Sequence, residues 1–125
     1  MEKLFQLLGQ QEAMRIVNLV IRSRRVTLLE FEILLDIDTA LLQKCLADLE
    51  EQGLIYSLSN EERQYYSISP LFIQEHEQLY YYLLEQLKMH VTYLTDLNRF
   101  NRYRLNRLSE QDIRDNRERV LSIIK

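Results

Sequence analysis

Glycine and proline are scarce in this chain: its 125 residues include two glycines and one proline. These residue types interrupt helices and shape turns, so their scarcity predicts a mainly helical protein with few breaks. They stand at Gly9, Gly53 and Pro70, which divide the chain into segments of very different length. The sequence has no serine- or glycine-rich tract, so no flexible linker is expected.

The hydrophobic pattern predicts two helices near the start of the chain. Residues 4–8 form a short apolar run that ends at Gly9, a residue that tolerates the left-handed conformation of a helix end. A second helix is expected from Gln11 to about Arg22, because apolar residues recur there along one broad helical face. The basic cluster at residues 22–25 favours a helix end, where positive charge complements the helix dipole.

The next two predicted helices have the spacing of a helix-turn-helix. Thr27 and Glu30 form the pattern of a capping box, in which a hydroxyl and a carboxylate bind free amides at a helix start. Asp38 or Thr39 can cap the following helix, whose apolar residues continue to Gly53. Two helices joined by a short turn, the second carrying polar residues outward, are typical of this DNA-binding motif.

A β-hairpin is expected directly after the helix-turn-helix. Residues 54–58 and 64–69 are rich in β-branched and aromatic side chains, and the polar residues 59–62 between them are typical of a hairpin tip. The sequence therefore predicts a winged helix, mainly α-helical with a two-stranded β-wing.

One long helix is predicted from Pro70 to residue 97. Pro70 suits the first turn of a helix, and apolar or aromatic residues recur after it at alternating spacings of four and three. Because a seam of this kind requires a partner helix, residues 71–97 are predicted to be the dimerisation helix of a homodimer. The interface residues expected on the seam are His76, Tyr80, Leu83, Leu87, His90 and Leu94.

The last segment, residues 98–125, is expected to be a basic helical extension that follows the DNA-binding domain at 1–70 and the dimerisation helix. Ser109 and Asp112 form a second capping box, at the start of a terminal helix. Four arginines lie among aromatic residues, a composition compatible with phosphate contact and equally with a solvated helix face that pairs with nearby carboxylates. They are Arg99, Arg102, Arg104 and Arg107.

Residues 8–17, 26–35 and 46–55, together with the wing end at 65–68, resemble the ArsR-type family of bacterial winged-helix repressors. Residues 8–17 are similar to the family's LSDPTRLRIL segment and residues 46–55 to LAKLREAGLV, and the resemblance extends over residues 4–95. It implies a dimeric, DNA-binding repressor. The departures are Gln10-Gln11 in place of Asp-Pro, Asp36 in place of a turn glycine, and Glu61-Glu62 in place of a basic wing tip.

Metal sensing, which the resemblance also implies, lacks its ligands in this sequence. The family's thiolate site would place cysteines near residues 28–31, where this chain has none. Its interhelical site would need four ligands, of which Glu77 and His90 alone are in register. No metal or cofactor is therefore predicted, and His76 and His90 are expected to pack in the dimer interface, with a proton-sensitive interface as the alternative.

DNA recognition is expected on the solvent face of the second helix of the motif. Thr39, Gln43 and Lys44 offer a hydroxyl, an amide and a positive charge to base edges and phosphates. In the wing, Arg63 and Gln64 are the candidates for contact with the minor groove or the DNA backbone. The alternative for all five is an ordinary surface position, with Thr39 as a helix cap.

Two further features each have a structural and a functional interpretation. Cys45 is expected to be a structural residue, although a thiol in the recognition helix is also a candidate for oxidation. The tyrosines at 80–82 are expected to pack at the interface, with an organic-ligand pocket as the alternative. A single cysteine fits a reducing cytoplasm, the chain has no apolar run of membrane-spanning length, and it has no motif typical of an enzyme.

The sequence thus predicts a sequence-specific, dimeric transcriptional regulator in the cytoplasm that binds double-stranded DNA. We expect a repressor that responds to a small-molecule or protein effector rather than to a metal. The net charge of −3 and the two glutamates of the wing motivate the alternative, a winged-helix protein-interaction or assembly module that does not bind DNA.

Overall fold

The computed structural model describes residues 2–23, 25–60 and 63–125, and it has the mainly helical winged-helix architecture that the sequence predicts. Within these ranges, no helix is long and apolar enough to cross a membrane. In chain order the elements are α1 (Glu2–Leu8), α2 (Gln11–Arg22), β1 (Val26–Thr27), α3 (Leu28–Leu35), α4 (Thr39–Glu51), β2 (Ile55–Asn60), β3 (Arg63–Ile68), α5 (Pro70–Glu75), α6 (Glu77–Leu87), α7 (Val91–Leu105), α8 (Glu110–Asp115) and α9 (Arg117–Ile124).

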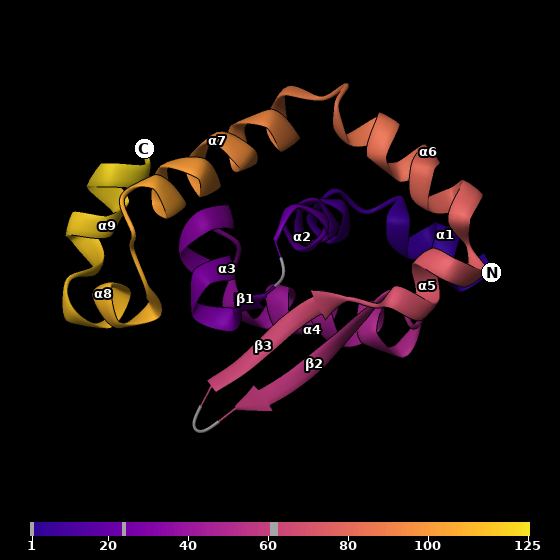
Figure 1. The fold of residues 1–125 in the computed structure, drawn as a ribbon, viewed down its shortest axis with the longest axis horizontal. Coiled ribbons are helices and arrows are strands. Elements are labelled where there is room, and N and C mark those ends of the chain that lie inside the picture. Colours follow the sequence, from indigo (N-terminus) through magenta and orange to yellow (C-terminus); the bar gives the residue numbers. More distant parts are fainter. Residues whose placement is uncertain (1, 24, 61–62) are drawn as a thin grey trace.

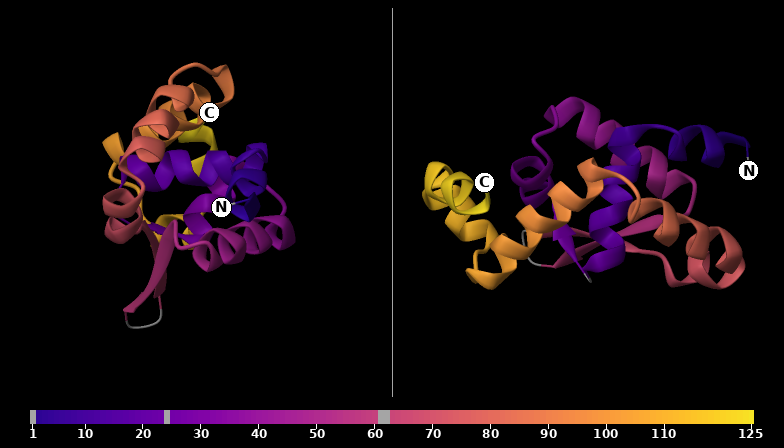
Figure 2. Two further views of the ribbon diagram at one scale, coloured as in Figure 1. Left: turned by 90° about the vertical axis from the view of Figure 1, so that its right-hand side faces the viewer. Right: turned by 90° about the horizontal axis from the view of Figure 1, so that it is seen from above.

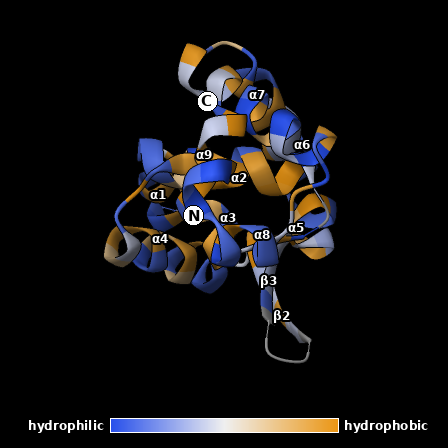
Figure 3. Cartoon of the chain, turned by 90° about the vertical axis from the view of Figure 1, so that its left-hand side faces the viewer, coloured by the Kyte–Doolittle hydropathy of each residue, from blue (hydrophilic) through white to orange (hydrophobic). Residues whose placement is uncertain are grey.

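Helix α2 lies at the centre of the molecule (Figure 1). Helices α1, α4 and α7 pack around it, and Figure 3 shows its apolar residues enclosed by the other elements. Burying one large aliphatic side chain stabilises a fold by roughly 1.5–3 kcal/mol. Because several such side chains of α2 are fully buried, this helix contributes a large share of the core's stability. Its side chains without exposed surface include Ala13, Ile16, Val17, Leu19 and Val20.

The helix-turn-helix consists of α3 and α4, and both helices are capped as the sequence predicts. The Thr27 hydroxyl accepts a hydrogen bond from the Glu30 amide at 3.2 Å, and the Glu30 carboxylate accepts one from the Thr27 amide at 3.0 Å. In the turn, Asp36 has a left-handed backbone with a φ of 52°, which aspartate tolerates better than most residues. Asp38 then caps α4 by accepting a hydrogen bond from the Leu41 amide.

The predicted two-stranded wing is present as the hairpin of β2 and β3, and it belongs to a three-stranded antiparallel sheet in the order β1-β3-β2, whose strand β1 was not predicted. The added strand, β1, has two residues, and Val26 pairs with Tyr66 of β3. So short a strand has no alternating pattern, and its partner is distant in the chain. Beyond β1, β2 and β3 continue as a hairpin that projects from the body of the molecule (Figure 2).

The segment after Pro70 is helical as predicted, but it is not one helix. It forms α5, α6 and α7, and the last two arch over α2 (Figure 1). His76, between α5 and α6, has φ −128° and ψ 47°, and His90, before α7, is extended with φ −120° and ψ 134°. Leu83 and Leu87 of α6 lie in the core of their own chain, where they are 3% and 1% exposed.

Helices α8 and α9 fold back against the body of the protein, with α8 packed on α3 and α9 on α7. The predicted capping box of Ser109 and Asp112 does start α8. The predicted single terminal helix is interrupted at Asn116, whose side chain caps α9 by accepting a hydrogen bond from the Arg119 amide. Helix α7 itself runs on to Leu105, so the predicted boundary at residue 97 falls within a helix.

Candidate nucleic-acid interface

Helix α4 exposes the three side chains predicted to meet DNA. Thr39, Gln43 and Lys44 are all exposed, while the opposite face of α4 is buried through Leu42, Leu46 and Leu49. Figure 2 shows that the wing projects on the side of the molecule where α4 lies. A helix and a hairpin presented side by side match the way in which winged-helix proteins approach a duplex.

Thr39 has a second contact that the sequence does not reveal. Its hydroxyl donates a hydrogen bond to the Glu32 carboxylate at 3.2 Å, which ties the start of α4 to α3. The cap of α4 is Asp38 rather than Thr39. A base contact by Thr39 would therefore compete with a bond inside the helix-turn-helix.

The charges around α4 are mostly negative. Lys44 is the basic residue of α4, while Asp48, Glu50 and Glu51 occupy its second half. Glu50 also accepts a hydrogen bond from the Ser57 hydroxyl of β2 at 2.8 Å, which joins the recognition helix to the wing. Contact of α4 with DNA phosphates would thus depend heavily on Lys44, since carboxylates repel the DNA backbone.

In the wing, Gln64 is exposed on β3 as predicted. The backbone of Arg63 belongs to β3, but its side chain lies outside the described part of the structure, as do the glutamates at 61 and 62. Beside Gln64 lies an open hollow of about 370 Å³ that α8 helps to line through Glu110 and Arg114.

Arg114 is a residue of this surface that sequence reasoning misses. Its guanidinium pairs with Glu110 at 2.7 Å, yet more than half of the side chain remains exposed. The position of α8 beside the wing depends on tertiary packing against α3, which has no signal in the local sequence. The candidate surface of α4 and the wing thus has α8 as a neighbour on the side of Gln64.

Helix α7 is joined to the helix-turn-helix by three polar contacts, one through Arg15 of α2 and two directly on α3. Asp96 binds Arg15 of α2, with Nε–Oδ2 and Nη2–Oδ1 distances of 2.8 and 3.0 Å, and the Arg15 Nη2 also donates to the Leu35 carbonyl at 2.7 Å. Arg99 donates to the Ile33 carbonyl at 3.2 Å. The hydrogen bond to Asp96 raises the pKa of Arg15 above its usual value, against the opposing effect of burial.

The third contact joins the end of α7 to the start of α3. The Tyr103 hydroxyl donates to the Glu30 carboxylate at 2.6 Å. Burial and this hydrogen bond together raise the pKa of Tyr103 far above its usual value. The carboxylate that caps α3 is thereby also the group on which α7 is anchored.

The basic stretch near the end of α7 is engaged within the protein rather than free. Besides Arg99, the Arg102 guanidinium donates to the Ile124 carbonyl at 2.9 Å and the Arg104 guanidinium to the Arg22 carbonyl at 3.4 Å. These acceptors lie at helix ends, where carbonyl groups lack partners. The sequence predicts contact of these arginines with phosphates or pairing with nearby carboxylates. It does not predict hydrogen bonds to main-chain carbonyls. Arg107 is exposed and has a left-handed backbone with a φ of 54°.

The six residues predicted for a dimer seam do not share one exposed face. Leu83 and Leu87 are buried, Tyr80 is half-buried, and Leu94 is 45% exposed. His76 packs its ring against Phe72 at 5.3 Å between centroids, and His90 packs against Tyr93 at 5.5 Å. The two histidines lie in different helix interruptions, His76 between α5 and α6 and His90 just before α7.

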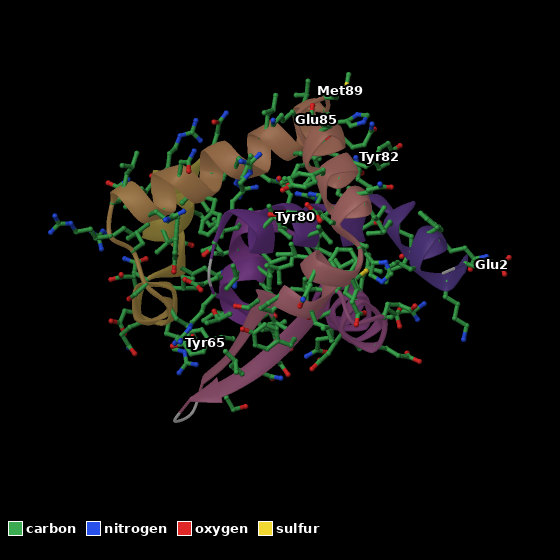
Figure 4. All side chains as sticks on the ribbon, turned by 45° about the vertical axis from the view of Figure 1, so that its right-hand side comes forward. Glu2, Tyr65, Tyr80, Tyr82, Glu85 and Met89 are labelled. Atoms are coloured by element: carbon green, nitrogen blue, oxygen red, sulfur yellow. The ribbon has the colours of Figure 1, made fainter. Side chains whose placement is uncertain are left out.

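A different apolar surface is exposed on the outside of the arch. Phe5 of α1 and Tyr82 of α6 line, together with His90, a pocket of about 300 Å³, and further exposed apolar side chains follow between α6 and α7 and in the first turn of α7. Figure 4 shows Tyr82 and Met89 on this outer side. We call this surface the apolar patch; its members are Phe5, Tyr82, Met89, Val91 and Leu94, each at least 45% exposed.

Cys45 and the histidines offer no reactive or metal-binding arrangement among the described residues. Cys45 is 1% exposed, and burial raises the pKa of its thiol. A buried thiol with a raised pKa has little thiolate at neutral pH. In the same described ranges, no three histidine, cysteine, aspartate or glutamate side chains lie close enough to hold a metal ion.

The comparison with solved structures finds a similar fold in one repressor. The crystal structure of the adhesin competence repressor (AdcR) from Streptococcus pyogenes is similar to this one, with a TM-score of 0.50 over 84% of this chain and 70% of that chain. The identity is 18%, so the likeness is one of fold. No family model matches the chain, and no curated protein is significantly similar in sequence. The narrower resemblance to the ArsR-type family stays a prediction.

Proposed function

We propose that this chain is a transcriptional regulator that binds double-stranded DNA through α4 and the wing. The observation that carries the proposal is the exposed row of Thr39, Gln43 and Lys44 beside a projecting hairpin, on a fold shared with a solved repressor. In this proposal the protein acts by binding rather than catalysis, and it represses by occupying the site that polymerase needs. Its signal is a small-molecule or protein effector.

Selection of bound sequences from a random DNA library, followed by gel-shift titration, tests this proposal. We expect a sequence-dependent complex whose affinity falls as salt rises. Lys44→Gln should weaken binding to all sequences and lower the salt slope by about one, since one phosphate contact is lost. Lys88→Gln is the matched control, because Lys88 is equally basic and exposed but lies at the end of α6. If neither the native chain nor Lys88→Gln is retained by DNA at low salt, the regulator proposal fails.

We further propose that the regulator is a homodimer joined through the apolar patch rather than through a heptad seam. Exposed apolar surfaces of this kind on a soluble protein mark interaction sites, and a two-fold dimer brings the same patch of each copy together. Analytical ultracentrifugation should show a dimer for the native chain and a monomer for Met89→Asp. Leu105→Asp is the control, because Leu105 is 82% exposed at the far end of α7. A native monomer, or two equally monomeric variants, would refute this interface.

The alternative function, a protein-interaction module that does not bind DNA, has its own support. This support comes from the acidic second half of α4, where Asp48, Glu50 and Glu51 lie next to the side chains proposed to contact DNA. Under this alternative the gel shift is negative for every sequence, and Lys44→Gln behaves as the native chain does.

A further inference from the structure

A cleft of about 1000 Å³ lies between the wing and the arch. Strand β2 contributes Tyr56 and Leu58, α5 contributes Ile73 and α6 contributes Tyr80. Leu58 pairs with Tyr65 across the hairpin and Tyr56 with Ser67, so these side chains share one face of the sheet. Tyr66, on the other face, packs against Phe31 of α3. The outer face is left open to solvent, and Tyr56 and Leu58 are 36% and 39% exposed.

Three arginines surround this apolar surface. Arg22 and Arg25 come from the end of α2 and the segment after it, and Arg104 comes from the end of α7. Arg25 lies over the Tyr65 ring at 5.6 Å, and Arg104 lies over Phe100 at 5.5 Å. Arg104 also donates one exposed hydrogen bond to the Arg22 carbonyl at 3.4 Å, which leaves its charge without a counter-ion among the described residues. Among the described residues the lining contains no carboxylate, and none of the three arginines has an ion-pair partner. This is a local excess of positive charge on a chain whose net charge is −3.

We propose that this arginine cleft docks an acidic, amphipathic peptide segment of a partner protein. Tyrosine and arginine are the side chains that contribute most energy at protein interfaces, and here two tyrosines and three arginines line one concave surface. The guanidinium groups come from two separate elements, so a chain with carboxylates at intervals can pair with several of them at once. The apolar side chains between those carboxylates would cover Leu58 and Ile73.

A volume of this size argues for a peptide over a small organic anion. The cleft reaches the upper limit of the range that small-ligand pockets span, roughly 300–1,000 Å³, and it is open along the wing. A single small anion would leave most of the apolar face in water. The partner would touch the wing and the arch together, so its docking is a route by which a protein effector reaches both, but the inference itself does not require DNA binding.

Fluorescence anisotropy with a labelled peptide tests the proposal on the full chain. The probe is the sequence Asp-Phe-Glu-Leu repeated three times, and two reference peptides replace its acidic residues with lysine or its apolar residues with serine. We expect the acidic probe to bind more tightly than both references, with an affinity that falls as salt rises. The double variant Arg22→Gln/Arg25→Gln should weaken binding about tenfold, as the loss of two solvent-facing ion pairs predicts.

The control is the double variant Lys88→Gln/Arg117→Gln, which removes the same charge from exposed positions outside the cleft. Circular dichroism melting checks that both variants remain folded, and Leu58→Ser tests the apolar contribution without altering charge. Equal weakening by the two double variants would overturn the proposal, and so would a lysine peptide that binds as well as the acidic one. Competition by single-stranded DNA or naphthalene sulfonate that exceeds competition by unlabelled peptide would assign the cleft to another ligand and equally overturn it.

Discussion

Replacement of Asp96 tests whether α7 stabilises the helix-turn-helix through a buried charge. The Asp96 side chain is 2% exposed and that of Arg15 is 18% exposed, and two short hydrogen bonds join them. Arg15 also holds the carbonyl of Leu35, the last residue of α3 before the turn. Loss of Asp96 would therefore leave the largely buried Arg15 guanidinium without its counter-ion, next to the helix-turn-helix.

The expected cost follows from this geometry. Removal of one partner from a buried ion pair typically costs 3–5 kcal/mol, because the other charge remains in a poorly solvated place. Arg15 keeps some access to water and its bond to Leu35, which reduces the penalty, so Asp96→Ala should lower the free energy of unfolding by about 2–4 kcal/mol. Asp96→Asn keeps an acceptor for one hydrogen bond and should cost less, about 1–3 kcal/mol.

Urea unfolding at pH 7 measures these values from the transition midpoint and slope. Glu85→Gln is the matched control, because its pair with Lys88 spans 3.4 Å between side chains that are 71% and 59% exposed; it should change stability by less than about 0.5 kcal/mol. A double-mutant cycle with Arg15→Met isolates the interaction. If Asp96→Asn costs no more than Glu85→Gln, or the cycle shows no coupling, the pair does not stabilise this junction.

Three further predictions concern single residues. The raised pKa of Tyr103 means that the unfolded tyrosine ionises first, so stability is retained below about pH 10 and lost as pH rises above it; Tyr103→Phe should show a shallower alkaline decline in urea titrations, and an unchanged slope would refute this. Gly53 has a φ of 78° and open space where a Cβ would stand, so Gly53→Ala should cost about 1 kcal/mol from backbone strain alone, whereas no loss in thermal unfolding would contradict it. Iodoacetamide at pH 8 should modify Cys45 far more slowly in the folded than in the unfolded chain, and equal rates by mass spectrometry would show that the thiol is accessible.

The local parts of the fold were predictable because their signals span only a few residues. A capping box needs a hydroxyl and a carboxylate three positions apart, and the sequence places both at Thr27 and Glu30. The bounds of α2 follow in the same way from a continuous apolar face and a basic end. The exposure of Gln43 and Lys44 follows from helical periodicity once α4 is placed.

The breaks in the arch were not predictable from periodicity. An alternating spacing of four and three marks a helix with one apolar face, but it does not say whether that face meets a second copy or the same chain. Leu83 and Leu87 satisfy the pattern by packing into their own core. Neither His76 nor His90 is a helix-breaking residue type, so the local sequence does not mark these interruptions.

The use of the arginines in α7 also lay beyond the sequence. Their spacing indicated a basic helix, but their acceptors are main-chain carbonyls at the ends of distant helices, such as Ile33 of α3 and Ile124 of α9. Every residue has a carbonyl, so no residue type marks these acceptors. The orphan carbonyls at a helix end become visible as partners only when the helices are placed.

Helix α7 is therefore the element that connects the two halves of the proposed regulator. Its first turn carries Val91 and Leu94 of the apolar patch. Its middle carries Arg99, which binds the Ile33 carbonyl near the end of α3, and Asp96, which binds Arg15 of α2 and through it the Leu35 carbonyl. A change in packing between subunits would displace the same helix that fixes α3, and α3 is joined to α4 by the short turn at Asp36. Communication in the proposed dimer would thus run along α7 and through helix-end carbonyls. We therefore expect Met89→Asp to reduce DNA affinity in the native chain. In a folded Asp96→Asn protein, the same Met89→Asp change should reduce that affinity less, as measured by gel-shift titration.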